Sequence, residues 1–131
     1  MCLFCKIIAG EIPCTKVYED DEVLAILDIA QTTKGHTLVM PKKHYEHVLE
    51  MPENEFAALM SKAQKLAQKI VANLDANGVN ILVNTKEAAG QTIPHAHVHI
   101  IPRYDGNDSI QISFGENQFD LAQIASQINK N

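Results

Sequence analysis

The sequence contains no tryptophan, few aromatic residues of any kind and only three cysteines among its 131 residues. Three cysteines cannot complete a framework of paired disulfides. No apolar run approaches the roughly 20 residues of a membrane span, and the amino terminus lacks the apolar stretch of a signal peptide. We therefore expect a cytoplasmic protein with no membrane partner.

Positive charge is also scarce, with 11 Lys and Arg against 16 Asp and Glu and a formal net charge of −5. The absence of a basic stripe argues against binding to a nucleic-acid polymer. A phosphate-bearing ligand would have to be small and held by local hydrogen-bond donors. With 46% hydrophobic and 21% charged residues, the chain (1–131) is predicted to form a single domain that needs no cross-links.

Histidine, in contrast, is concentrated at alternate positions of residues 94–102, as His95, His97 and His99. The proline-bracketed segment is predicted to be a β-strand, in which successive side chains point to opposite faces. The three imidazoles would then share one face, and the apolar residues between them would face the core. Such a row can serve metal binding, nucleophilic or acid/base catalysis, or phosphate binding. A polar solvent face is the alternative, although such faces usually include Thr, Lys and Glu.

The amino terminus carries a C-x-x-C motif formed by Cys2 and Cys5. Apolar residues recur at helical spacing over residues 2–10, so both thiols are predicted to lie on the same side of a short helix. Two thiolates so placed can approach a single ion. In a reducing compartment the motif indicates metal binding or redox chemistry, and both remain open at this point.

The remaining pattern predicts strands at 16–19, 22–28, 37–41 and 79–85, with 22–28 buried on both faces. A long amphipathic helix is predicted from about residue 52 to 77, and a terminal helix at 119–128. With the histidine strand, this order of elements indicates an α+β protein with a mainly antiparallel sheet. The small-residue loop at 87–92 is of a kind that brings backbone N–H groups close to an anion.

The histidine motif His95-Ala96-His97-Val98-His99, followed by apolar residues, resembles the signature of the histidine-triad family, and in particular its bacterial Hint-like nucleotide hydrolases. Other stretches resemble the family in the same order: Phe4-Cys5-Lys6-Ile7-Ile8, Val17-Tyr18-Glu19-Asp20, Leu27-Asp28-Ile29, Lys34-Gly35-His36-Thr37 and Ile101-Pro102-Arg103. The resemblance covers residues 2–104 and leaves 105–131 as a C-terminal extension with a helix. It implies the histidine-triad fold: a mainly antiparallel five-stranded sheet, one long helix and a C-terminal helix.

The resemblance also implies roles for individual residues. His97 would attack the α-phosphorus of a nucleotide and form a nucleotidyl-histidine that water hydrolyses, with His99 and His36 completing the catalytic set. Asp28 would bind the ribose hydroxyls. The implied phosphate contacts, besides His99, are Asn84, Gln91 and Thr92, and the implied base slot consists of Phe4, Ile7, Ile26 and Ile29. Thr92 stands where relatives of mammalian Hint carry Ser, which bears on leaving-group preference.

A zinc site is implied separately. In several bacterial members and in the galactose-1-phosphate uridylyltransferase branch, the C-x-x-C, a downstream histidine and the first triad histidine bind zinc. The matching positions are Cys2, Cys5, His44 and His95, a closed set that suits one structural Zn²⁺ per chain. A thioredoxin-like redox role is the alternative, but the order of elements does not supply that fold. His47 lies outside every matched site and is expected to be exposed.

Three functions are compatible with these residues. The first is a hydrolase that acts at the α-phosphate of purine nucleotide derivatives, such as nucleoside phosphoramidates, and releases a nucleoside monophosphate. The second is a dinucleoside polyphosphate hydrolase, as in the Fhit branch. The third is a zinc-stabilised nucleotide-binding or adaptor protein without turnover. The resemblance further implies a homodimer that buries the helix at 52–77 and the strand at 79–85.

Overall fold

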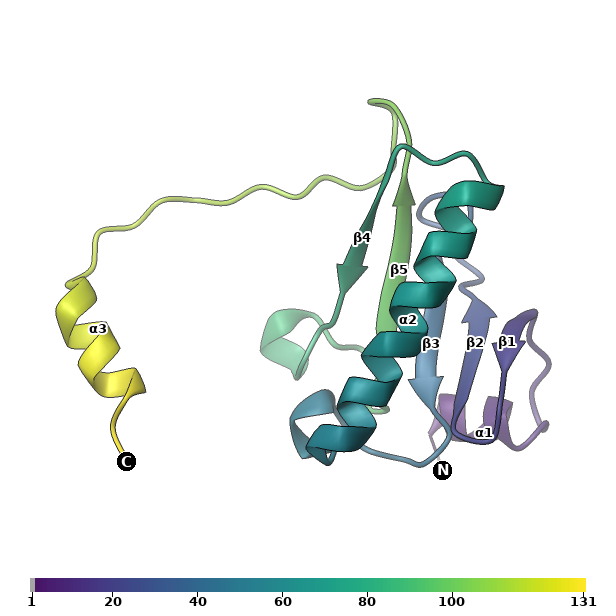
Figure 1. The fold of residues 1–131 in the computed structure, drawn as a ribbon, viewed down its shortest axis with the longest axis horizontal. Coiled ribbons are helices and arrows are strands. Elements are labelled where there is room, and N and C mark those ends of the chain that lie inside the picture. The colour runs from purple at the N-terminus through teal and green to yellow at the C-terminus, as the bar shows by residue number, and fades with distance from the viewer. Residues whose placement is uncertain (1) are drawn as a thin grey trace.

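The computed structural model describes residues 2–131 and contains one sheet whose strands pair antiparallel in the order β1-β2-β3-β5-β4 (Figure 1). The strands are β1 (Lys16–Glu19), β2 (Val23–Leu27), β3 (Thr37–Pro41), β4 (Gly78–Leu82) and β5 (Val98–Arg103). This architecture confirms the predicted α+β fold with a five-stranded antiparallel sheet. The strands β1 and β4 form its two edges.

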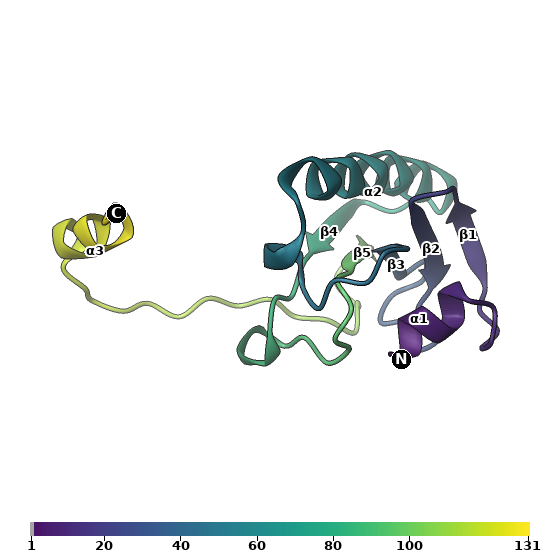
Figure 2. The same cartoon turned by 90° about the horizontal axis from the view of Figure 1, so that it is seen from below.

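Helices cover both faces of the sheet (Figure 2). The long helix α2 (Glu53–Asn73) lies across one face, and the short helix α1 (Leu3–Ile8) lies on the other. Two 3-10 turns, η1 (Val48–Glu50) and η2 (Glu87–Ala89), interrupt the connections. The last helix, α3 (Leu121–Ile128), stands apart from the sheet at the end of an extended segment (Figure 1). Among residues 2–131, no helix has both the length and the apolar character that crossing a bilayer requires.

The helix α2 packs on the sheet through one stripe at helical spacing: Leu59, Ala63, Leu66, Ala67 and Ile70. The helix begins after Pro52, and Glu53 and Glu55 in the first turn complement the helix dipole. It ends at Asn73, earlier than predicted, because Asp75 adopts a left-handed conformation with φ 56° that turns the chain toward β4.

The central strands have buried side chains on both faces, which explains their continuous apolar sequence. In β2, Val23 and Ala25 belong to the core beneath α2, whereas Leu24 and Ile26 belong to the core beneath α1. The first four residues of β2 and all five of β3 are buried. These two layers fix the sheet as a rigid support for groups on the α1 side.

The prediction that all three histidines lie within one strand is wrong for His95 and His97, because β5 begins at Val98. The backbone N–H of Ala96 donates to the carbonyl of Tyr45 at 2.7 Å, outside the sheet ladder. The alternation of side chains nevertheless continues through the segment. Three alternate residues, Ala96, Val98 and Ile100, are buried in the core beneath α2, so the histidines face the α1 side.

Candidate functional site

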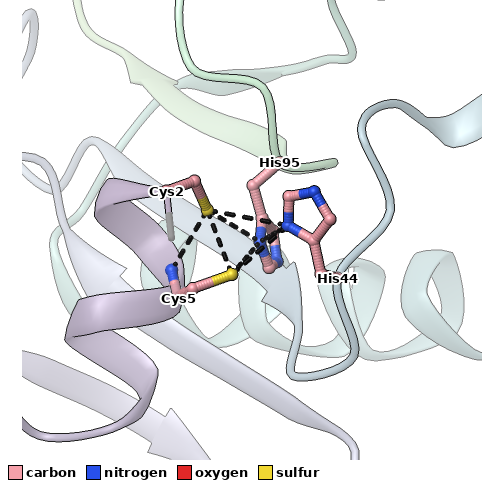
Figure 3. A group of neighbouring side chains, drawn as sticks. All are labelled: Cys2, Cys5, His44 and His95. Atoms are coloured by element: carbon pink, nitrogen blue, oxygen red, sulfur yellow. Dashed lines mark hydrogen bonds between the residues drawn. The ribbon is translucent and has the colours of Figure 1, made fainter.

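Four side chains from three parts of the chain converge beside α1 (Figure 3). Cys2 caps the start of α1, and Cys5 lies one turn later. His44 follows β3, and His95 precedes β5. Their Sγ and Nδ1 atoms are separated by six distances between 3.1 and 3.6 Å. Six nearly equal distances between four atoms define a tetrahedron. We call these residues the cysteine–histidine cluster.

The cluster matches what a tetrahedral metal ion requires. An ion with bonds of about 2.0–2.3 Å holds its ligands roughly 3.3–3.8 Å apart, close to the distances observed. The Nε2–H of His95 donates to the carbonyl of Pro41 at 2.8 Å, which leaves Nδ1 as the atom with a free lone pair. Burial lowers the pKa of His95 and favours this neutral form. Two sulfurs and two imidazole nitrogens suit Zn²⁺ better than a hard cation.

His97 is held in a defined orientation next to the cluster. Its Nδ1–H donates to the backbone carbonyl of His95 at 2.7 Å, so Nε2 carries the lone pair. The ring is buried and meets the edge of Phe4, with 5.0 Å between ring centroids. Burial lowers the pKa of His97, although the hydrogen bond to the His95 carbonyl and the charge of Asp28 oppose the shift. The result is a neutral imidazole with one fixed, unprotonated nitrogen, as a nucleophile needs.

A chain of hydrogen bonds assigns the tautomers of the other two histidines. The N–H of Thr32 points at Nδ1 of His36 at 3.4 Å, so His36 carries its proton on Nε2. That proton is donated to Nδ1 of His99 at 3.0 Å. His99 must then carry its own proton on Nε2, where it can donate to an anion. The carboxylate of Asp28 lies 3.8 Å from Nε2 of His36.

Burial governs the protonation of this pair of histidines. It lowers the pKa of His36, with Asp28 opposing the shift, and it lowers the pKa of His99 to about 4 with help from His97 and His36. Both rings are therefore neutral at pH 7. Asp28, His36 and His99 lie close enough to share an ion. The hydrogen bond between His36 and His99 and the approach of the Asp28 carboxylate to His36 already account for the arrangement.

A cavity of about 550 Å³ opens between α1, the end of β2 and the loop that follows β2. Ile7 and Ile26 line it together with Asp28 and Ile29. The side chain of Ile29 is 99% exposed, which is unusual for an isoleucine and places an apolar surface at the rim. Phe4 does not line this cavity. It is buried and contacts the rings of His95 and His97 instead.

The remaining implied phosphate contacts lie in the loop before His95. Gln91 and Thr92 line a second cavity of about 560 Å³. The amide nitrogen of Gln91 donates to the carbonyls of Glu46 and Ile93. Its oxygen accepts from the N–H of Lys86, so Gln91 braces the loop. The amide of Asn84 faces Gly90 in the same loop.

The exposure of the His47 side chain is lower than expected. Its side chain is only 15% exposed and lines the cavity that contains Gln91 and Thr92. Among residues 2–131, its buried Nδ1 has no hydrogen-bond partner. No local sequence signal indicates this low exposure, because residues of the loop at 87–92, distant in the sequence, line the cavity with His47 only in the folded chain. Sequence reasoning also missed Thr32 and Pro41, whose backbone groups set the histidine tautomers.

Comparison with known proteins matches residues 9–106 to the model of the HIT domain. The chain belongs to the HIT family. An uncharacterised HIT-like protein of Methanocaldococcus jannaschii is 47% identical over 129 residues, 98% of each chain. The adenylylsulfatase HINT3 of Arabidopsis thaliana is 49% identical over 102 residues, which are 78% of this chain and 52% of that protein.

Solved structures agree with this membership of the HIT family. A HIT-family protein from Bacillus subtilis matches with a TM-score of 0.91 and 45% identity, covering 97% of this chain and 94% of the other. A zinc-bound histidine-triad protein from Mycobacterium smegmatis matches with a TM-score of 0.78 and 36% identity, covering 96% of each chain. These matches confirm the fold and the family inferred from the histidine motif.

Proposed function

We propose that the protein hydrolyses purine nucleotide derivatives at the α-phosphate and releases a nucleoside monophosphate. The observation that carries the proposal is the hydrogen bond from Nδ1–H of His97 to the His95 carbonyl, because it leaves Nε2 unprotonated. The Nε2 lone pair attacks the α-phosphorus while the bond from phosphorus to the leaving group breaks. The leaving group departs with the bonding pair and takes a proton from solvent.

Water then attacks the phosphorus of the nucleotidyl-histidine. Its oxygen forms the new bond to phosphorus, one of its protons is lost to solvent, and Nε2 of His97 recovers its lone pair. His99 supports both steps because its Nε2–H is available to a phosphate oxygen. Asn84 and Thr92 supply further donors, and Gln91 holds their loop in place. His36 fixes the tautomer of His99.

Substrate recognition in this proposal uses the cavity beside α1. The carboxylate of Asp28 accepts hydrogen bonds from the ribose hydroxyls, and the apolar side chains of Ile7, Ile26 and Ile29 cover a purine. The name of the plant relative describes cleavage of an adenylyl group from sulfate, which supports an adenosine α-phosphate as the reacting centre. Phe4 packs against the ring of His97.

The cysteine–histidine cluster would hold one Zn²⁺ that stabilises the fold and leaves the chemistry to His97. The near-tetrahedral ligand positions and the zinc-bound relative support this assignment. A homodimer that buries α2 and the strand β4 is also part of the proposal. The edge position of β4 and the partly exposed side chain of Ile81 support it.

The experiment compares turnover of an adenosine phosphoramidate, adenylyl sulfate and a diadenosine polyphosphate by the same enzyme. We expect the first two to be hydrolysed with a higher kcat/KM than the dinucleotide. The reverse order would favour the dinucleoside polyphosphate hydrolase. Absence of turnover on all three, with nucleotide binding intact, would favour the binding or adaptor protein.

A further inference from the structure

A cavity of about 440 Å³ opens between the second half of α2, the strands β1 and β2 and the loop that follows β2. We call it the α2 cavity. Among residues 2–131, its lining includes nothing from β4, and β1 lies at the opposite edge of the sheet from β4. This flank of α2 is therefore separate from the proposed dimer contact at β4. The apolar wall of the cavity consists of Val17, Leu27, Leu66, Ile70 and Leu74.

The charged groups that line the α2 cavity are two ammonium groups, those of Lys34 and Lys69. Among residues 2–131, neither lysine forms an ion pair with a carboxylate. The lining contains no acidic residue, although the net charge of the chain is −5. The amide of Asn73 lies on the same lining and can donate a hydrogen bond. The cavity thus combines an apolar wall with positive charge that lacks a counter-ion.

Gln31 and Leu27 separate the α2 cavity from the cavity that contains Asp28, because both residues line both cavities. The side-chain nitrogen of Gln31 donates to the carbonyls of Asp28 at 2.6 Å and His36 at 2.8 Å. Its Oε1 accepts from the N–H of Gly35 at 2.8 Å. Gln31 is exposed in the unoccupied protein, so water competes for these three hydrogen bonds. They hold the loop from residue 28 to 36 together.

We propose that the α2 cavity binds a small amphipathic carboxylate, such as a medium-chain fatty acid. The alkyl chain lies on the apolar wall, and the carboxylate lies beside Lys34 and Lys69. The cavity volume falls within the range of about 300–1,000 Å³ that is usual for small-molecule sites. Burial of the alkyl chain supplies most of the binding free energy, while the two ammonium groups favour an anion and disfavour a cation.

The same occupant is expected to increase nucleotide affinity, a consequence that rests on the proposed function. An alkyl chain packed against Gln31 excludes water from its three hydrogen bonds and so strengthens them. The loop that they hold carries Asp28, the proposed ribose ligand, and His36, which fixes the tautomer of His99. We expect the occupied protein to bind AMP at least about threefold more tightly, and bound AMP to tighten carboxylate binding by the same factor.

Calorimetric titration of the full-length protein with octanoate tests the site in the absence of nucleotide. Octylammonium has the same chain with the opposite charge, and acetate has the carboxylate without the chain. We expect a dissociation constant for octanoate below about 1 mM and at least about tenfold lower than for either matched ligand. Weaker binding of octanoate, or equal affinity for octanoate and octylammonium, would overturn the site.

Amide chemical shifts locate the bound octanoate. The largest changes are expected at Gly35 and Asn73, which line the α2 cavity. The largest changes at Ile7 and Cys14 would instead place octanoate in the proposed nucleotide cavity and overturn the proposal. Dissociation of a dimer by octanoate, measured by sedimentation, would show that a second copy of the chain occupies the α2 cavity, and it would also overturn the proposal.

Two lysines of α2 provide a matched pair of substitutions. Lys65 and Lys69 are both exposed, but only Lys69 lines the α2 cavity. We expect Lys69→Glu to weaken octanoate binding at least about fivefold and Lys65→Glu to leave it within about twofold. Equal losses in the two variants would contradict the proposed position of the carboxylate. Thermal unfolding of both variants provides the check that they are folded.

Titration of AMP with and without saturating octanoate tests the link between the two cavities. Tighter AMP binding in the presence of octanoate supports the link. Unchanged AMP affinity would overturn the link and leave the carboxylate site standing. Octanoate binding to a protein that binds no AMP in either condition would count against the proposed function, and the carboxylate site would again stand.

Discussion

The backbone carbonyl of His95 accepts the Nδ1–H of His97 at 2.7 Å. The side chain of His95 meanwhile belongs to the cysteine–histidine cluster, with its Nδ1 3.4 Å from Sγ of Cys2. One residue thus connects the cluster to the proposed nucleophile. A change that shifts His95 will move the carbonyl that fixes the tautomer of His97. Fold stability and chemistry are therefore expected to change together when the cluster is disturbed.

Metal content tests the cluster directly. Protein purified without chelator is expected to contain about one zinc per chain by elemental analysis, and Cys5→Ser is expected to contain almost none, because a lost thiolate opens the tetrahedral set. Cys14→Ser is the matched control, since Cys14 lies outside the cluster. Metal-free wild-type protein, or equal zinc in both variants, would count against the site.

The proposed contact between Ile29 and the purine is tested by Ile29→Ser. Because Ile29 is almost fully exposed, its removal should change the free energy of unfolding by less than about 0.5 kcal/mol. If a purine covers it, affinity for a nucleoside monophosphate should fall about tenfold, as expected from the loss of about 1.5 kcal/mol of apolar burial. Leu49→Ser alters another exposed apolar residue and should leave calorimetric affinity unchanged. Unchanged affinity in both variants would show that the nucleotide does not bind against Ile29 in this cavity.

The buried histidines are expected to make the free energy of unfolding depend on pH. The pKa of His99 is about 4 in the folded chain, below its ordinary value of 6.5. Between these values the unfolded chain binds a proton that the folded chain does not, so stability falls as the pH drops from about 6.5 to 4. His99→Gln should flatten this dependence when denaturant midpoints are measured across that range. Parallel pH curves for His99→Gln and wild type would show that His99 is not the source.

Two glycines with left-handed backbones differ in what surrounds them. An added Cβ at Gly35 (φ 96°) would collide with Cδ1 of Leu74 and lie 3.2 Å from Cγ of Pro102, whereas Gly10 (φ 82°) faces open space. Gly10→Ala should cost about 1–2 kcal/mol of unfolding free energy from backbone strain alone. Gly35→Ala should cost about 1–3 kcal/mol more from overpacking. Equal melting temperatures for the two variants would contradict this difference.

The sequence was informative where structure depends on local periodicity. The apolar stripe from Leu59 to Ile70 predicted α2, and the continuous apolar run predicted the doubly buried strand β2. The alternation around His97 predicted correctly which side chains face the core, even though β5 begins only at Val98. The family resemblance supplied the residues of the cysteine–histidine cluster, which lie 42 and 93 positions apart when counted from Cys2 to the two histidines.

Features that depend on distant contacts could not be predicted in the same way. The start of β5 follows from the hydrogen bond between Ala96 and Tyr45, and the low exposure of the His47 side chain follows from a cavity that it shares with the distant loop at 87–92. The T-shaped contact between the rings of Phe4 and His97 also joins residues 93 positions apart. The helix at the end of the chain could be predicted, whereas its separation from the sheet depends on the Arg103 contacts at the start of the extended segment.

The assignment of His97 as the nucleophile is tested by rapid quenching of a single turnover of adenosine phosphoramidate, followed by mass spectrometry of the digested protein. We expect an adenylyl group on the peptide that contains His97, localised to that residue. In His97→Ala the adduct should be absent and hydrolysis should fall by several powers of ten, while nucleotide affinity persists. An adduct on another residue, or undiminished hydrolysis by His97→Ala, would contradict the assignment of His97 as the nucleophile.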